Sequence, residues 1–326
     1  MADNKDNNSL GWILGITALI GAGVTVFEAI RKSKENKNKT ISYDNPKPKE
    51  QEPTIEQNNK NVNSRSRGEE KLNAMIGLEG VKQKINIVKA SFAKQKALGN
   101  KVDLNFCFYG NPGTGKTEVA RLVGRIFYEK GLLPTPNFYE TDRSGLVGEY
   151  IGQTAPKTHE IFKKALGGVL FIDEAYTLSA SGDNDFGKEA VAALLKDMED
   201  YRGKICVILA GYKAEMNKMF EINPGFKSRI RQYVDFPDYS SDEIKKIISF
   251  IAKKEKYTIT ESALNAMTKI VMKRAGQPNF ANAREARNVY ESVRDVQALR
   301  TEGNMDTKII YADVLEYAKL EKIDID

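Results

Sequence analysis

Apolar and polar residues alternate along this chain in two patterns. Between residues 72 and 238, short apolar runs are separated by longer stretches with the spacing of amphipathic helices. Short apolar runs that alternate with helices predict buried parallel strands covered by helices. We therefore expect an α/β domain over residues 72–238, with strands near residues 104–109, 137–142, 168–172, 204–210 and 232–236.

After residue 238, the strand-like runs give way to helical periodicity. Apolar residues recur at helical spacing over residues 241–255, 260–275 and 282–300. These segments predict a small helical domain over residues 239–326.

The chain begins with an apolar segment. Residues 10–27 contain no charged side chain over 18 positions. As a helix they would be about 27 Å long, close to the roughly 30 Å of a bilayer core. Asp3, Lys5 and Asp6 precede this segment and an excess of basic residues follows it, whereas a cleaved signal peptide has positive charge before its apolar run. We therefore expect residues 1–30 to form a single-pass transmembrane anchor, with the rest of the chain in the cytoplasm. A buried or surface-lying helix is the alternative, and the lack of a polar face counts against it.

Residues 31–71 have the composition of a linker. Asn, Lys, Glu, Gln, Pro and Ser dominate there, and apolar residues are scarce. Such a segment cannot bury enough apolar surface to offset its chain entropy. We expect it to be disordered.

Charge and cysteine content narrow the possible partners. Lys and Arg number 50 and Asp and Glu 44, which gives a net charge of +6. A nucleic-acid-binding domain usually carries a larger positive excess, so this balance counts against nucleic acid as a partner. Cys107 and Cys206 lie in apolar runs and are expected to be buried, inert thiols.

A phosphate-binding motif follows the first predicted strand. Residues 110–117 read Gly-Asn-Pro-Gly-Thr-Gly-Lys-Thr, which is the GxxxxGK[ST] pattern. Its glycines let backbone N–H groups surround phosphates, and the helix that follows directs its positive end toward them. Lys116 is expected to reach the β and γ phosphate oxygens, and the Thr117 hydroxyl to hold Mg²⁺. The rest of the predicted nucleotide-binding loop is Asn111, Pro112, Gly113, Thr114 and Gly115.

An acidic pair follows the apolar run at residues 168–172. It consists of Asp173 and Glu174. Because strand ends in open parallel sheets face the ligand crevice, we expect Asp173 to hold Mg²⁺ and Glu174 to orient and deprotonate an attacking water. A solvated turn is the alternative. A glutamate beside a metal-binding aspartate favours hydrolysis over phosphate transfer to another substrate.

With these motifs the chain resembles the AAA+ ATPases and, within them, the CbxX/CfqX family, which includes the red-type Rubisco activase and the stage V sporulation protein K relatives. The resemblance covers about residues 72–320. It rests further on residues 75–80, 146–157, 208–212, 223–230 and 280–287. It implies a P-loop AAA+ core with a helical lid, and ATPase activity with ATP and Mg²⁺.

The resemblance also implies roles in nucleotide recognition. The segment with Ile76 and Gly77 matches the box that lines the adenine pocket, and a simple helix-entry turn is the alternative. The strand at residues 204–210 matches the one that carries a polar sensor of the γ-phosphate. There, however, Tyr212 stands where AAA+ proteins at large have Asn or Thr, which leaves its role in hydrolysis open.

Two arginines match further family positions. Arg229 matches the arginine finger that reaches the γ-phosphate of a neighbouring subunit, where a guanidinium stabilises the transferring phosphoryl group. Arg231 is the weaker candidate for that role, and a surface arginine without a role is the alternative. Arg284 matches the second sensor on a lid helix, with Arg287 one turn later on the same face. A finger acting in trans implies a ring, by analogy a hexamer.

Residues 145–152 resemble the loop that lines the central pore of such rings. Tyr150 and Ile151, flanked by glycines, would grip an extended polypeptide through apolar contacts. The alternative is that Tyr150 packs against its own subunit. Residues 179–187 have loop composition and are a weaker candidate for a second pore loop. His159 is expected at the surface, without a catalytic role.

These features predict an ATP-hydrolysing ring motor that remodels a protein client of unknown identity, tethered to the cytoplasmic face of a membrane through residues 10–27. One alternative is a DNA-acting AAA+ loader or initiator, against which the nearly neutral core and the pore-type aromatic residue count. The other is an ATP-dependent assembly scaffold, against which Glu174 and Arg229 count. A Rubisco client is not assigned, because the residues give it no independent support.

Overall fold

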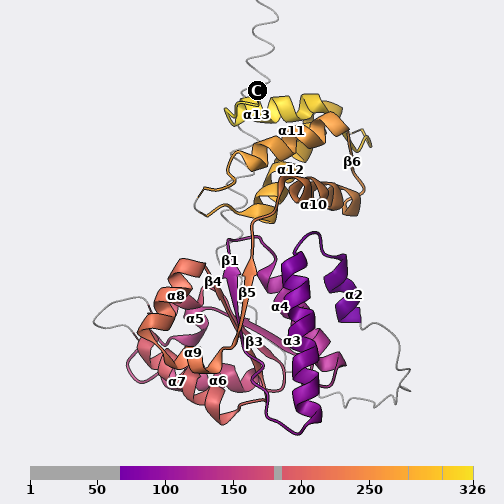
Figure 1. Cartoon of the computed structure of the whole chain (residues 1–326). Helices are drawn as coiled ribbons and strands as arrows, with labels where there is room; N and C mark the ends of the chain where they lie inside the picture. The colour runs from indigo at the N-terminus through magenta and orange to yellow at the C-terminus, as the bar shows by residue number, and fades with distance from the viewer. Residues whose placement is uncertain (1–66, 180–185, 278, 303, 326) are drawn as a thin grey trace, which may run out of the picture. The chain divides into compact units, whose positions relative to one another are not determined.

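The computed structural model describes residues 67–179, 186–277, 279–302 and 304–325. In chain order, an α/β region is followed by a helical region, as the hydrophobic pattern predicts (Figure 1).

The predicted transmembrane anchor requires a correction. Residues 10–27 lie outside the described residues, and within the described part of the chain no helix is both long and apolar enough to cross a bilayer. The fold class is therefore an α/β core with a helical lid, without the predicted transmembrane helix, and the predicted membrane tether and membrane localisation are withdrawn with it. The prediction rested on hydropathy over a segment barely as long as a bilayer core, and the four glycines in this segment weaken insertion further.

The boundary of the predicted linker also differs. Helix α2 spans Arg67–Ala74, so residues 67–71 are helical. Leu72 is buried, and the Glu69 carboxylate lies 2.8 Å from Lys89 Nζ and 3.4 Å from Lys130 Nζ. These contacts anchor a segment that its polar composition alone would leave unfolded. Residues 31–66 lie outside the described residues.

A five-stranded parallel sheet forms the centre of the α/β region. Its strand order is β2-β3-β4-β1-β5. The strands span β1 Phe106–Gly110, β2 Phe138–Thr141, β3 Val169–Ile172, β4 Cys206–Gly211 and β5 Gln232–Phe236. The inner strand β1 pairs with β4 and β5, so that Phe106 lies opposite Ile208 and Gln232. All strands therefore end at one edge, where ligands of open α/β sheets bind.

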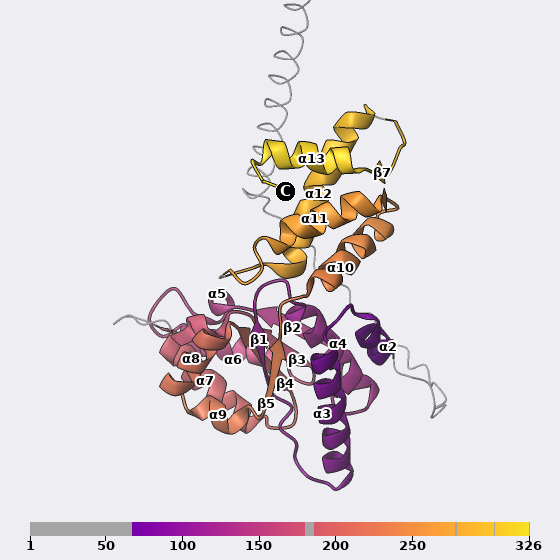
Figure 2. The same cartoon turned by 45° about the horizontal axis from the view of Figure 1, so that its top comes forward.

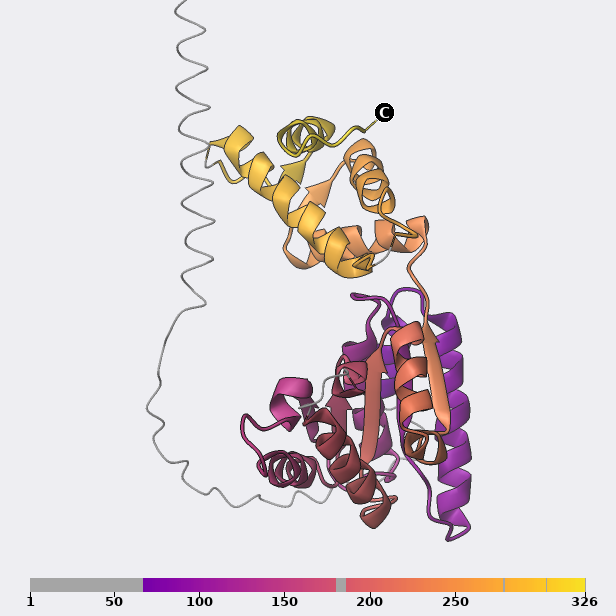
Figure 3. The ribbon, with the colours of Figure 1, turned by 90° about the vertical axis from the view of Figure 1, so that its left-hand side faces the viewer.

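The side chains of β1 contribute to two separate cores. Phe106 and Phe108 belong to one buried cluster and Cys107 and Tyr109 to the other, because successive strand residues point to opposite faces. Helices cover both faces (Figure 3). On the first face lie α2, α3 (Glu79–Ala97) and α4 (Lys116–Glu129), and on the second α6 (Thr154–Lys164), α7 (Gly187–Asp200) and α8 (Lys213–Ile222). The shorter helices are α5 (Arg143–Leu146), η1 (Ala175–Ser179) and α9 (Gly225–Arg229).

The helical region contains the helices that the periodicity predicts (Figure 2). They are α10 (Ser241–Lys254), α11 (Glu261–Met272), α12 (Asn282–Thr301) and α13 (Tyr311–Leu320), with a two-stranded pair of β6 (Thr258–Ile259) and β7 (Lys308–Ile309). Helix α10 begins with a capping box, in which Ser240 Oγ accepts from Glu243 N at 3.3 Å and Glu243 Oε2 accepts from Ser240 N at 2.8 Å. Such caps stabilise a helix start by about 1 kcal/mol.

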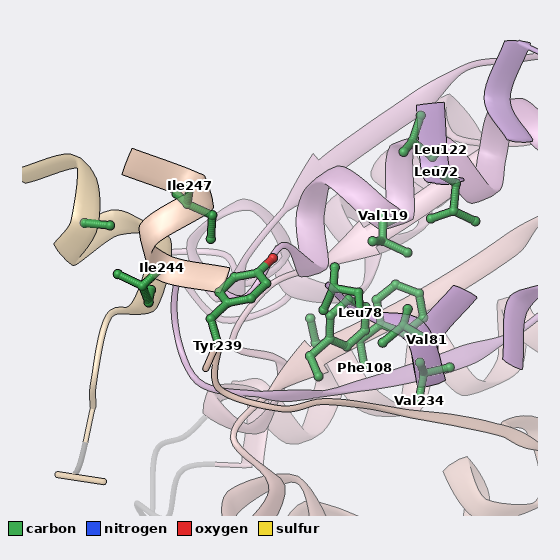
Figure 4. Packing of buried hydrophobic residues seen from close by; sticks show 14 of the residues in the cluster. Leu72, Leu78, Val81, Phe108, Val119, Leu122, Val234, Tyr239, Ile244 and Ile247 are labelled. Carbon is green, nitrogen blue, oxygen red and sulfur yellow. The ribbon is translucent and has the colours of Figure 1, made fainter. Parts of the chain in front are cut away.

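Tyr239 connects the sheet to the lid. It lies between β5 and α10 and is 7% exposed. Its ring lies between Ile244 of α10 and Leu78 of the core (Figure 4). The Tyr239 hydroxyl donates to Thr114 O at 3.2 Å. The end of β5 is therefore attached to the predicted phosphate-binding loop as well as to the lid.

Candidate nucleotide-binding site

The predicted phosphate-binding loop joins β1 to α4 at the carboxyl edge of the sheet. Gly113 has φ 70°, and a Cβ there would lie 2.1 Å from Ala281 O and 2.9 Å from Arg284 N, so only glycine fits. Thr114 is fully buried, and its Oγ1 donates to Asn111 O at 2.8 Å. The loop is thus held in one shape, with its backbone against the start of α12.

Lys116, the first residue of α4, points back to this loop. Its Nζ donates to Gly110 O and to Asn111 O, each at 2.8 Å. Burial lowers the pKa of Lys116, and the nearby Arg284 guanidinium lowers it further, whereas the two carboxylates after β3 raise it. Lys116 follows β1 and the acidic pair follows β3 at the same edge of the parallel sheet, and Arg284 N lies against Gly113 of the loop, so these groups lie at one site.

Asp173 and Glu174 lie directly after β3, at the edge that also carries the loop. Glu174 N donates to Asp173 Oδ1 at 3.0 Å. Glu174 has φ 46°, a left-handed conformation that costs energy for any residue other than glycine. Thr177 stabilises this turn, because its backbone N and its Oγ1 donate to Glu174 O at 2.9 and 2.7 Å. The turn leaves the Glu174 side chain exposed beside a partly buried Asp173.

Thr117, the predicted Mg²⁺ ligand, follows Lys116 in the first turn of α4 and is partly buried. A hydroxyl and a carboxylate are hard oxygen donors of the kind that Mg²⁺ takes together with phosphate oxygens. Thr117 and Asp173 therefore have the right chemistry for Mg²⁺.

Tyr212, which follows β4, also lies at this edge. Its ring centroid is 5.9 Å from that of Tyr176 in η1. Burial raises the pKa of Tyr212, and the Glu174 and Glu215 carboxylates raise it further. Burial likewise raises the pKa of Tyr176 to about 12, with Glu174 as the next cause. The structure thus brings two phenol rings, tilted by 51° to each other, close to the acidic pair.

The turn with Ile76 and Gly77 lies between α2 and α3. Gly77 has φ 61°, and a Cβ there would lie 1.9 Å from Glu243 Oε1 at the start of α10. Lys82 Nζ donates to Met75 O at 2.7 Å and holds the turn from the other side. Ile76 packs against the same buried cluster as Tyr239. The predicted adenine segment is therefore near the junction of core and lid.

Helix α12 brings Arg284 to the site. Ala283 N donates to Gly113 O at 3.2 Å, so the first turn of α12 contacts the phosphate-binding loop. Arg284 is exposed there, and its guanidinium contributes to lowering the pKa of Lys116 after burial, the main cause. Arg287, one turn later, pairs with Glu291 at 3.8 Å.

A polar cluster that the sequence does not predict lies beneath this junction. Asp238 accepts from Asn111 Nδ2 at 2.9 Å and from Asn282 Nδ2 at 2.7 Å. Asn282 is fully buried, and its Oδ1 accepts from Tyr239 N at 2.9 Å. The one available signal was that Asn282 belongs to the segment 280–287 on which the family resemblance rests, whereas Asp238 gave no signal.

The structure does not bring Arg229 to the loop of its own chain. Arg229 precedes β5, at the amino edge of the sheet, where Asn105 Nδ2 donates to Arg229 O at 3.1 Å. The length of β5 separates the two edges, roughly 15 Å at about 3.3 Å per residue. Within its own subunit, Arg229 Nη2 lies 3.2 Å from Glu199 Oε2, and Nη1 donates to Gly225 O at 3.1 Å.

The predicted pore residues lie at an exposed loop tip between α5 and α6. Tyr150 is 67% exposed and Ile151 89% exposed. The base of the loop is fixed, since Gly148 N donates to Thr154 Oγ1 at 3.1 Å and Lys157 Nζ to Val147 O at 2.8 Å. The Tyr150 ring is therefore not buried in its own subunit.

The remaining residues singled out from the sequence have structural surroundings. His159 Nδ1 lies 2.7 Å from Asp197 Oδ2, which joins α6 to α7. Cys107 and Cys206 are fully buried, and burial raises the pKa of both thiols. Residues 180–185 of the weaker second pore-loop candidate lie outside the described residues.

Two family descriptions match the chain. Residues 106–238 match the "ATPase family associated with various cellular activities (AAA)", and residues 240–326 match the "AAA lid domain". The division between them falls at the hinge before α10.

Several curated proteins are similar to the chain. Protein CfxQ of Xanthobacter flavus is 46% identical over 233 residues, which cover 69% of this chain and 74% of CfxQ. Stage V sporulation protein K of Bacillus subtilis is 42% identical over 241 residues, covering 71% and 75%. Protein CbbX of Cereibacter sphaeroides is 42% identical over 233 residues, covering 69% and 75%.

Solved structures share the fold. The Thermotoga maritima RuvB Holliday junction branch migration motor superposes with a TM-score of 0.55 at 22% identity, covering 76% of this chain and 71% of RuvB. The FIGL-1 AAA domain in complex with ADP superposes with a TM-score of 0.54 at 17% identity, covering 77% and 84%. At these identities the likeness concerns the fold alone.

Proposed function

We propose, from the premise that this chain belongs to the CbxX/CfqX family of AAA+ ATPases and hydrolyses ATP, that it works as a ring, by analogy a hexamer, that uses ATP turnover to remodel a protein client. The single observation that carries the remodelling is the exposure of Tyr150 and Ile151, 67% and 89%, on a loop with a fixed base.

In the proposed site, the backbone of residues 110–117 holds the phosphates and Lys116 neutralises charge on the β and γ oxygens. Thr117 and Asp173 hold Mg²⁺, which when bound supplies positive charge to the phosphate oxygens. The Glu174 carboxylate accepts the proton of the attacking water. The backbone of Ile76 and Gly77 lines the adenine pocket.

The site is completed by charges from outside the loop. Arg284 approaches the phosphates from the lid of the same chain. Arg229 serves the site of a neighbouring subunit, and its position at the edge opposite its own loop supports this assignment. A guanidinium supplied in trans stabilises the charge that spreads over the transferring phosphoryl group. Hydrolysis is then a property of the ring.

The client is proposed to be an extended polypeptide. A tyrosine and an isoleucine side by side bind polypeptide through apolar contacts that need no particular sequence. A protein that binds nucleic acid instead needs Lys and Arg side chains to neutralise the phosphates of the nucleic-acid backbone. The fold shared with a DNA motor at 22% identity does not change this assignment.

A photo-crosslinking residue at position 150 tests the client proposal. The test uses the Glu174→Gln form, which is expected to retain ATP. With a benzophenone in place of Tyr150, irradiation of cells should crosslink it to another protein. In a lysate, excess ADP added before irradiation should prevent this adduct from forming. The matched control carries the benzophenone at Leu299, which is 68% exposed on α12. Equal adducts at both positions, or adducts to nucleic acid, would contradict the proposal.

A further inference from the structure

The polar cluster under the junction of core and lid connects four parts of the ATP site. Asp238 lies just after β5, Asn111 in the phosphate-binding loop, Tyr239 in the hinge and Asn282 at the start of α12. Asp238 accepts from Asn111 Nδ2 through both oxygens, at 2.9 and 3.1 Å, and from Asn282 Nδ2 at 2.7 Å.

Asn282 is the central member of the cluster. It is fully buried and has φ 48°, a left-handed conformation that asparagine tolerates better than most residues. Its Nδ2 also lies 3.1 Å from Phe280 O and 3.4 Å from Pro112 O of the loop, while its Oδ1 accepts from Tyr239 N at 2.9 Å. The amide orientation follows from these partners, because only the nitrogen can face a carboxylate and two carbonyls.

The cluster sets the distance between the loop and Arg284. Arg284 lies two residues after Asn282, and the backbones of loop and helix meet where Ala283 N donates to Gly113 O at 3.2 Å. No Cβ would fit at Gly113. A change in the position of Asn282 therefore moves Arg284 relative to the phosphates that the loop holds.

We propose that Asp238 and Asn282 are positioning residues for ATP hydrolysis, which hold the phosphate-binding loop and the Arg284 end of α12 in one arrangement. The inference rests on the proposed function, since it requires Arg284 to act on bound ATP. Neither residue needs to touch the nucleotide.

The test exchanges the two side chains. Asn282→Asp places two carboxylates where an amide and a carboxylate meet at 2.7 Å, so kcat/KM for ATP should fall at least tenfold. In the double variant Asp238→Asn and Asn282→Asp, the new amide donates to the new carboxylate and accepts from Asn111, and the carboxylate still accepts from Tyr239 N. Because the new carboxylate at position 282 faces Phe280 O and Pro112 O without a proton to donate, this variant should recover only part of the loss, at least about threefold over Asn282→Asp.

Hydrogen exchange separates positioning from general destabilisation. In Asn282→Asp the Ala283 amide, which donates to Gly113 O, should exchange faster, while amides around the buried Tyr290 on the same helix keep their protection. Asn265→Asp, the same change at an exposed position of α11, is the matched control and should leave kcat/KM unchanged.

Three results keep this inference separate from the proposed function. If Arg284→Ala leaves kcat and KM unchanged, the role of Arg284 fails and the inference fails with it. If Arg284→Ala impairs turnover while a folded Asn282→Asp does not, the inference alone is overturned. A double variant that is folded but no more active than Asn282→Asp overturns it as well.

Discussion

The two edges of the central sheet differ in how complete they are. At the carboxyl edge, Lys116 begins α4, Asp173 and Glu174 lie on the turn after β3, and Arg284 lies in the first turn of α12, all within one chain. At the amino edge, Arg229 lies roughly a strand length away, with no nucleotide site of its own chain within reach. One chain therefore holds the predicted phosphate-binding and Mg²⁺-binding residues at one edge of the sheet, whereas Arg229, which we propose to act on a neighbouring subunit, lies at the other.

Mixing two inactive variants tests whether Arg229 acts on a neighbouring subunit. Arg229→Ala should lower ATP turnover at least about 100-fold, because the transition state loses a guanidinium, and Glu174→Gln should do so by removing the base. In a mixture, a site with intact Glu174 can lie beside a neighbour with intact Arg229. Turnover measured at equal total protein should therefore return to a substantial fraction of wild type.

Arg231→Ala is the control. Arg231 is exposed and lies directly before β5, and this variant should retain turnover. Mixtures that stay inactive although both variants assemble would refute the trans arrangement. Turnover in Arg229→Ala alone at the wild-type level would refute any role of this arginine in hydrolysis.

The next effect concerns the short distance between the phosphate-binding loop and the start of α12 at the carboxyl edge. Gly113→Ala forces a methyl group to within 2.1 Å of Ala281 O at a position with φ 70°. We expect it to lower the free energy of unfolding by about 2–3 kcal/mol, and to raise the KM for ATP. Urea denaturation and steady-state kinetics measure the two effects.

Gly131→Ala is a matched control for Gly113→Ala. It has a similar φ, 66°, but no neighbouring atom within 4 Å of the added carbon. It should cost only about 1 kcal/mol and leave KM unchanged. Equal effects of the two substitutions would show that backbone strain, rather than contact with the lid, determines the result.

A smaller effect concerns the ion pair of Arg229 with Glu199 at the amino edge. Glu199 Oε2 lies 3.2 Å from Arg229 Nη2, so in the proposed ring the guanidinium has to leave this carboxylate before it can serve a neighbour. Because Glu199 is 54% exposed, the pair is worth roughly 0.2–1 kcal/mol. Glu199→Gln should therefore raise kcat by no more than about fivefold, with KM unchanged.

Asp200→Asn removes the same charge from the neighbouring position of α7, where Asp200 is exposed. It should have no such effect on kcat. A lower kcat in Glu199→Gln would mean that the carboxylate holds Arg229 in its working orientation instead.

The smallest effect is a pH dependence at Lys116. Burial lowers the pKa of Lys116 below its ordinary value of 10.5, so near that pH the unfolded chain binds more protons than the folded one. Stability should then rise with pH in the window between the lowered pKa and 10.5, by linkage. Lys116→Met should lose this rise, as measured by urea denaturation at pH 8 and pH 10. A parallel dependence in both proteins would contradict it.

Parts of the site that are encoded by neighbouring residues could be predicted from the sequence. The loop at residues 110–117 and the pair Asp173 and Glu174 each combine a short motif with an adjoining strand, and local chemistry determines both. The helices after residue 240 likewise follow from apolar periodicity.

Other parts depend on packing between distant segments. Asp238 and Asn282 meet only because α10 and α11 fold between them, and no local pattern reports that. The left-handed backbone of Glu174 is a local feature, stabilised by Thr177 three residues later, but composition does not reveal its hydrogen bonds. For residues 10–27 the prediction went too far instead, because a transmembrane helix was inferred from the apolar composition of the segment alone.

The two thiols inside the sheet are shielded from thiol-reactive reagents. Cys107 and Cys206 are its only cysteines, both are fully shielded, and their burial keeps them protonated at neutral pH. Any cysteine introduced at the surface would therefore be the one that maleimides or oxidants modify. Dyes or disulfide staples could be placed on single subunits of an assembly without first removing a native sulfur.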